Sequence, residues 1–121
     1  SNISIIDTKD KAISAGENST IKGNKININN ASIALTSKDL SKLIMNEVQI
    51  YNCDVVFTVF QKKSEYGPAY LNSKNTIYTN FKIDHMVQFN NSLIINSDSI
   101  VPTFLNVESK LYGNEYGKSS E

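Results

Sequence analysis

Apolar and polar residues alternate in short runs along most of the chain, most clearly in the stretch 31–53, ASIALTSKDLSKLIMNEVQIYNC. Alternation with a period of two predicts a β-strand with one buried face. Polar residues at 36–39, 46–47 and 51–52 separate the runs and favour bends. Because the runs are too short for ordinary helices, the stretch predicts three short strands separated by corners. The alternating apolar pairs are Ile33 and Leu35, Leu43 and Met45, and Val48 and Ile50.

The same pattern returns along the chain at steps of about 22 residues, and two columns of apolar residues share an enlarged step of 28 or 29 residues at the same place. A short strand cannot bury a face alone, but stacked copies can pair in parallel and align their apolar residues in continuous columns. The repeat therefore predicts an all-β solenoid. The predicted columns are Ile3, Ile26, Val48, Ile77 and Ile100; Ile5, Ile28 and Ile50; Ile21, Leu43, Leu71 and Leu93; and Ile13, Ile33 and Val55, followed two places later by Ala15, Leu35 and Phe57.

We assign each copy to one rung of the solenoid. The rungs are 11–30, 31–53, 54–81 and 82–101, with 1–10 as the end of an earlier rung. The enlarged step places extra residues in a loop at 61–70. The fourth rung is less regular, and its predicted inward residues are Val87, Phe89, Leu93 and Ile95.

Asparagines recur at equivalent corners of the predicted rungs. Asn24 and Asn46 match in position, as do Asn30 and Asn52. Stacked side-chain amides can hydrogen-bond along such a column, as they do in other stacked β structures. The alternative is that Asn is simply common in this composition and at bends. The sequence leaves both interpretations open.

The chain after Pro102 has a different pattern. Proline cannot donate to a strand ladder, so Pro102 is predicted to end the pairing. Thr103 can cap a helix, Phe104, Val107 and Leu111 have helical spacing, and Gly113 is a natural stop. We therefore expect a short helix over the open apolar end of the last rung, since terminal units of solenoids need a cover. This divides the chain into rungs at 1–102 and a cap with a tail at 103–121.

A family resemblance is carried by the segments 10–19 (DKAISAGENS) and 33–41 (IALTSKDLS), and by the turn at 61–63 with Tyr66-Gly67. Together with the stepped columns, they resemble the right-handed parallel β-helix of the pectate-lyase-like superfamily over about residues 3–101. More narrowly, they resemble the C-terminal rungs of β-helix modules in large bacterial surface proteins. The resemblance implies a right-handed parallel β-helix of about four rungs with a short C-terminal helical cap, in an extracellular or cell-surface protein.

Composition excludes several kinds of chemistry. The net charge is zero and all 12 basic residues are Lys, so no nucleic-acid partner is expected. Cys53 is the single cysteine and is predicted to be a buried core residue. No apolar run is long enough for a membrane helix, and no membrane insertion is expected.

The resemblance also argues against catalysis. Lyases of the β-helix family use an Arg base with an Asp-rich calcium cluster, and this chain has no Arg. Its hydrolases use clustered Asp residues with a His, whereas the Asp residues here fall at the edges of separate rungs. His85 is the single histidine, and we expect Asp84 to point to the opposite face of the strand. No catalytic residue, metal site or cofactor is therefore predicted. The separate acidic residues are Asp7, Asp10, Asp54 and Asp84.

The predicted loop holds the one dense mixture of charged and aromatic residues. Function on a rigid scaffold usually resides in loops, and tyrosine rings could stack on sugars while charged groups bond to hydroxyls. The alternative is a surface loop whose rings pack over the coil and which Pro68 stiffens. The candidate ligand-binding residues are Lys62, Lys63, Glu65, Tyr66 and Tyr70.

The sequence thus supports two functional hypotheses. The first is a non-catalytic module, the capped C-terminal end of a larger protein, that acts as a scaffold or recognition surface. Its expected partners are upstream rungs or domains of a parent protein, a polysaccharide, or a second copy bound end to end. The second hypothesis is a carbohydrate-active module, a polysaccharide lyase or hydrolase, whose catalytic residues lie in rungs upstream of this chain.

Overall fold

The computed structural model describes residues 2–63 and 65–112. It is an all-β structure with one six-stranded sheet, in which the strands follow one another in chain order. Neighbouring strands from β1 to β5 pair in parallel, and β5 pairs with β6 in antiparallel fashion. The predicted all-β class is confirmed. The elements are β1 (Ile3–Ala15), β2 (Thr20–Lys38), β3 (Lys42–Phe60), β4 (Tyr70–Val87), β5 (Ser92–Ile95), β6 (Asp98–Ile100) and the short helix α1 (Val107–Tyr112).

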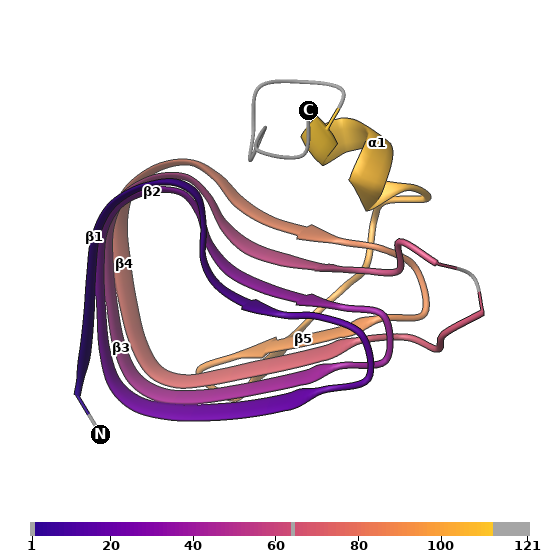
Figure 1. Cartoon of the computed structure of the whole chain (residues 1–121), viewed down its shortest axis with the longest axis horizontal. Coiled ribbons are helices and arrows are strands. Elements are labelled where there is room, and N and C mark those ends of the chain that lie inside the picture. The colour runs from indigo at the N-terminus through magenta and orange to yellow at the C-terminus, as the bar shows by residue number, and fades with distance from the viewer. Residues whose placement is uncertain (1, 64, 113–121) are drawn as a thin grey trace.

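The four long strands follow one bent path and lie nested against each other (Figure 1). Two corners of this path are made by residues with positive φ, a backbone conformation that Asn and Asp adopt more readily than most residues. Lys25 and Glu47 adopt it as well, although neither is a favoured residue type there. The corner residues are Asp7 (58°), Asn30 (65°), Asn52 (61°) and Asn80 (58°) at one bend, and Lys25 (59°), Glu47 (55°) and Asn75 (49°) at the other.

Hydrogen bonds between amide side chains connect the corners of neighbouring strands. At one corner Asn46 Nδ2 donates to Asn24 Oδ1 at 2.9 Å, which decides between the two interpretations in favour of the ladder. Asn75 Nδ2 extends this column by donating to Asn46 Oδ1 at 2.8 Å. The amide ladder is therefore present and links β2, β3 and β4.

The other corner has a ladder with a different pairing from the predicted one. Asn52 Nδ2 donates to Asn29 Oδ1 at 2.9 Å rather than to Asn30. Asn30 instead donates from Nδ2 to Asp7 Oδ1 at 2.8 Å, and Asn80 donates to Asn52. Asn30 is the left-handed residue of its corner, so its side chain is directed toward Asp7 of β1.

Apolar residues from successive strands stack in the main core cluster on the inner side of the bends. The pairing confirms the column Ile21, Leu43, Leu71 and Leu93 and the column Ile5, Ile28 and Ile50. Cys53 also lies in this cluster, 7% exposed. Burial, with a smaller effect of Asp54, raises the pKa of its thiol to about 11.

Two other predicted columns are wrong in part. Val48 pairs with Thr76, whereas Ile77 pairs with Gln49 and is 58% exposed. Ile100 does not continue the column, because β6 pairs with β5 in the antiparallel direction.

The column of Ile13, Ile33 and Val55 is confirmed between β2 and β3, where Ile33 pairs with Val55 and, two places later, Leu35 pairs with Phe57. It is wrong for β1, because the register between β1 and β2 shifts between Thr8 and Lys11. As a result Ile13 pairs with Leu35, and Lys11 pairs with Ile33. In the last predicted rung, Phe89 is 46% exposed rather than inward.

Helix α1 does not cover the end of the stack as predicted. It packs on the flank, where Val107 and Leu111 are fully buried in a second core cluster. That cluster includes Ile33 of β2 and Val55 and Phe60 of β3. The segment between β5 and α1 instead runs across the end of the stack (Figure 1), and Ile100 packs against the main core cluster.

The cap residue of α1 also differs from the prediction. Asn106 Oδ1 accepts a hydrogen bond from the Ser109 amide at 3.0 Å, so Asn106 is the N-cap. The amide of Thr103 donates to the Val87 carbonyl instead. The chain also pairs once more after Pro102, through a bridge between Gln88 and Phe104. The predicted stop at Gly113 and the tail at 114–121 lie outside the described residues.

The column of Leu43 provides a test of the stack. We expect Leu43→Asp to lower the free energy of unfolding by about 3–5 kcal/mol, because it places an unpaired carboxylate in a dry apolar column. Chemical denaturation followed by circular dichroism measures this. Lys42→Asp, at an exposed position on the same strand, is the control and should change stability by less than about 1 kcal/mol. A Leu43→Asp protein as stable as the control would show that the column is misassigned.

Candidate functional site

The loop between β3 and β4 is fixed to the stack by a buried carboxylate. Asp39 is 1% exposed, and its Oδ1 accepts hydrogen bonds from the amides of Lys62 at 2.7 Å and Lys63 at 2.8 Å. Asp39 has a φ of 52° and donates its own amide to the Phe60 carbonyl. Within the loop, Gln61 Nε2 donates to the Tyr66 carbonyl at 2.8 Å. The start of the loop is therefore held by the preceding corner.

Lys63 and Tyr66 meet at Glu17, which lies in the turn after β1. Lys63 Nζ and Glu17 Oε2 are 2.5 Å apart, and the Tyr66 hydroxyl donates to Glu17 Oε1 at 3.2 Å. The hydrogen bond from Lys63 lowers the pKa of Glu17, and the same bond raises the pKa of Lys63. The hydrogen bond to Glu17 raises the pKa of Tyr66. The three groups form an exposed ion-pair cluster that joins the loop to the turn after β1.

The structure separates the five predicted binding residues. Tyr66 and Lys63 contact Glu17, whereas the hydroxyl of Tyr70 accepts a hydrogen bond from Asn72 Nδ2 at 3.0 Å on β4. Ring contacts between described residues join Tyr78 to Phe57 and to Phe81 and do not include Tyr66 or Tyr70. Lys62 and Glu65 are exposed. The loop thus offers Tyr66 beside charged groups, and Tyr70 belongs to a neighbouring surface.

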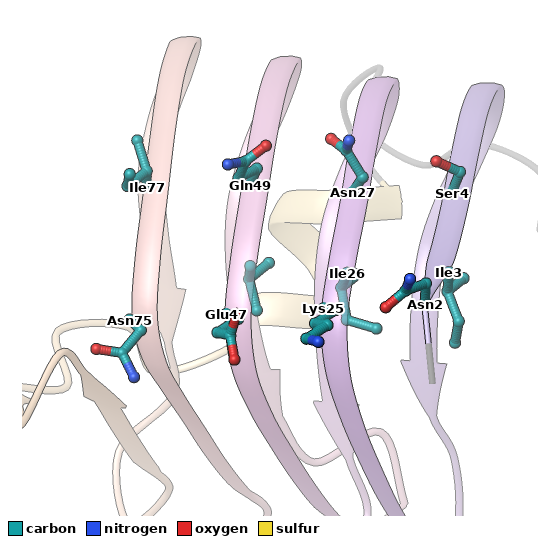
Figure 2. A pocket seen from close by; sticks show the side chains of 11 residues that line it. Asn2, Ile3, Ser4, Lys25, Ile26, Asn27, Glu47, Gln49, Asn75 and Ile77 are labelled. Atoms are coloured by element: carbon teal, nitrogen blue, oxygen red, sulfur yellow. The ribbon is translucent and has the colours of Figure 1, made fainter.

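A groove that sequence reasoning missed runs across the outer face of β1 to β4 (Figure 2). Its volume is about 630 Å³, and its walls combine amide, hydroxyl and charged side chains with exposed Ile77. Parallel pairing places these side chains in two rows across the strands. One row is Ser4, Asn27, Gln49 and Ile77, and the other is Asn2, Lys25, Glu47 and Asn75. The sequence signal for this groove is the set of polar residues that alternate along each strand, once the strands are aligned in their observed register.

His85 and Asp84 contact each other, contrary to the prediction. His85 Nδ1 and Asp84 Oδ2 lie 2.6 Å apart, and both side chains are about one-third exposed, at 29% and 35%. The hydroxyl of Tyr78 hydrogen-bonds to the same carboxylate, and burial with this bond raises the pKa of Tyr78 to about 12. The three residues form a polar cluster, the Tyr78–Asp84–His85 cluster.

Broken alternation explains why two neighbouring residues share one side. On β3, Val55 lies in the second core cluster, whereas both Val56 and Phe57 lie in the main core cluster. His85 pairs with Phe57 and Ile83 with Val55. Asp84 therefore occupies the position of Val56, and both polar side chains belong to the inner side.

Among the described residues, no group of three or more His, Cys, Asp or Glu side chains could hold a metal ion. In the part of the chain that the structure describes, no helix has the length and hydrophobicity needed to span a bilayer.

Comparisons with known proteins identify no relative. No protein-family model, curated protein or solved structure matches the chain.

Asp39 is the residue whose removal should free the loop. We expect Asp39→Ala to destabilise the protein by about 2–4 kcal/mol, since two hydrogen bonds to a carboxylate and a left-handed backbone residue are lost together. Asp39→Gly keeps the left-handed backbone and removes only the carboxylate. Both variants should speed hydrogen exchange at the Lys62 and Lys63 amides. Unchanged protection in Asp39→Gly would contradict the anchoring role.

Tyr78 should titrate at a higher pH than an ordinary tyrosine. The ordinary phenol pKa is about 10, and the folded value is about 12, so the folded state favours the neutral form. The stability that this residue contributes is present below pH 10 and is lost as the pH rises toward 12. Ultraviolet absorbance of phenolate follows the titration, and Tyr78→Phe should remove the late step. A Tyr78→Phe protein with the wild-type titration curve would contradict the assignment.

Proposed function

We propose that the chain is a non-catalytic module with the architecture of a right-handed parallel β-helix. The observation that carries this proposal is the order of the parallel strands, in which each long strand pairs along its length with its predecessor in the chain. Parallel strands that follow each other in sequence need a return path, and such connections are right-handed in nearly all proteins. Here the bent strands themselves provide that path (Figure 1).

The module acts as a rigid recognition surface within a larger surface or extracytoplasmic protein. The amide ladders and buried columns fix the strands, so the outer face presents its side chains at a constant spacing. A pre-formed surface loses little conformational entropy on binding. The resemblance to bacterial β-helix modules supports the location.

The ligand of this surface is an uncharged or weakly charged polysaccharide. The lining of the groove includes amides and a hydroxyl, such as Asn27, Gln49 and Ser4, which can exchange hydrogen bonds with sugar hydroxyls. Aliphatic residues such as Ile3 and Ile77 supply apolar surface beside them. The one lysine and one glutamate of the groove, Lys25 and Glu47, offset each other. Tyr66, beside Lys63 and Glu17 at the loop, provides a separate aromatic face that is not part of the groove lining.

The upstream side of the module accepts further strands. β1 forms one edge of the sheet, and its Ile3 and Ile6 are 40% and 66% exposed. An edge strand with apolar side chains is a template for pairing with another strand. The partner is a preceding rung of a parent protein or a second copy.

A glycan array tests the recognition function. We expect the wild-type protein to bind a neutral glycan, and Asn27→Ala/Gln49→Ala to lose at least tenfold in affinity because the groove loses two hydrogen-bonding amides. Tyr66→Ala/Tyr70→Ala tests the loop in parallel. Thr79→Ala, which changes an exposed β4 residue outside the groove lining, is the control and should bind like wild type.

Each outcome of the array decides one part of the proposal. Loss of binding only in the tyrosine variant would move the site to the loop. Absence of binding to every glycan would reject recognition and leave the scaffold role. Depolymerisation of any polysaccharide by the wild-type chain would falsify the non-catalytic proposal.

A further inference from the structure

The last long strand has an open edge at the C-terminal end of the stack. β5 pairs with β4 only from Tyr70 to Ser73. Thr76 then exchanges hydrogen bonds with the side chain of Asn96, and the Val87 carbonyl accepts from Thr103 and Phe104. Within residues 2–63 and 65–112, no strand pairs with β4 between these two points on the side away from β3. The stretch 77–86 therefore has an edge without a partner strand, and another strand can pair with such an edge.

The inner side of β4 is polar at several positions that are apolar on the other strands. Thr76 replaces Val48, and Tyr78 replaces Ile50. The main core cluster continues toward this end through Phe57, but His85 occupies the next place in that column. The polar inward positions of β4 and their β3 partners are Ser73 with Met45, Thr76 with Val48, Tyr78 with Ile50, Asp84 at the place of Val56, and His85 with Phe57. Leu71, Phe81 and Val87 stay apolar opposite Leu43, Cys53 and Val59.

The polar side chains on the inner side of β4 form hydrogen bonds with one another. Ser73 and Thr76 share a hydrogen bond between their hydroxyls at 2.5 Å. The Asp84 carboxylate hydrogen-bonds to the Tyr78 hydroxyl and to His85 Nδ1, and the side chain of Asp84 is 35% exposed. The ring of Tyr78 meets Phe57 edge to face, with centroids 5.2 Å apart, so this cluster lies directly on the apolar core.

We infer that the Tyr78–Asp84–His85 cluster closes the C-terminal edge to strand addition. A strand stacked on β4 would bury a carboxylate and an imidazole against its own inward side chains, and a charge without water or a new partner is strongly unfavourable there. Inward-pointing charged residues are one way in which proteins protect sheet edges. The inner side of β1 carries Ile5 and Ile13 instead, so strand addition is directed to that edge alone.

The test replaces the three residues of the cluster on β4 with the residues at the equivalent positions of β3. We expect Tyr78→Ile/Asp84→Val/His85→Phe to self-associate with an association constant at least tenfold above that of wild type, measured by sedimentation over a range of concentrations. Hydrogen exchange identifies the surface used, because association at this edge should slow exchange of amides in 77–86. In the wild type, the amides of 77–86 that do not donate to β3 should exchange fast at every concentration, even where β1 mediates association.

Two further variants separate charge from general hydrophobicity. Tyr78→Ile/His85→Phe keeps Asp84 and should return to the wild-type association constant. Lys74→Val/Thr79→Ile/Lys82→Val places three apolar residues on exposed positions of the same strand and should not slow exchange in 77–86.

Three results would overturn the inference. The first is a triple variant that folds by circular dichroism and associates no more than wild type. The second is a wild-type chain whose 77–86 amides become protected on association. The third is that Lys74→Val/Thr79→Ile/Lys82→Val associates through 77–86 as strongly as Tyr78→Ile/Asp84→Val/His85→Phe. If the triple variant does not fold, Asp84→Val/His85→Phe with Tyr78 retained carries the same expectations.

Discussion

Parallel, in-register pairing of bent strands is the constraint on which the rest of this structure depends. Strands can follow one path only if every corner bends at the equivalent residue, so the left-handed residues Asp7, Asn30, Asn52 and Asn80 recur in step. Amide hydrogen bonds between neighbouring corners stabilise the same register that aligns the apolar columns. Corner and core specify one alignment, and agreement between local and global preferences of this kind favours a single native state.

The extra residues of the third step are accommodated because they fall at a corner. A loop can leave the path between β3 and β4 without disturbing the register on either side, since Leu43 still pairs with Leu71. The buried carboxylate of Asp39 binds the start of this loop from the previous corner. The loop surface is consequently held in place by the stack, although its side chains stay exposed.

The two ends of the stack differ in what they offer to other chains. Apolar residues point inward from β1, whereas the inner side of β4 carries the polar residues Tyr78, Asp84 and His85. A stack of parallel strands could otherwise add strands at both ends, because each exposed edge matches the path of the next strand. In this chain the helix contributes little to that distinction, since α1 packs on the flank.

The sequence by itself determined the strand class, the step of the repeat and the column of Leu43, because each depends on a local pattern that recurs at constant spacing. It placed Asn24 and Asn46 at equivalent corners, but only the structure decided that their amides form a ladder. Residue counting could not find the register shift between Thr8 and Lys11, since a bulge consumes residues without advancing the strand. The same limit hid the contact of Asp84 with His85, because strict alternation predicts opposite sides and the break at Val56 and Phe57 exists only in the packed strand. Contacts between distant segments, such as Tyr66 with Glu17 across 49 residues, were decided by the tertiary structure alone, because only the stacking of the strands brings those corners together.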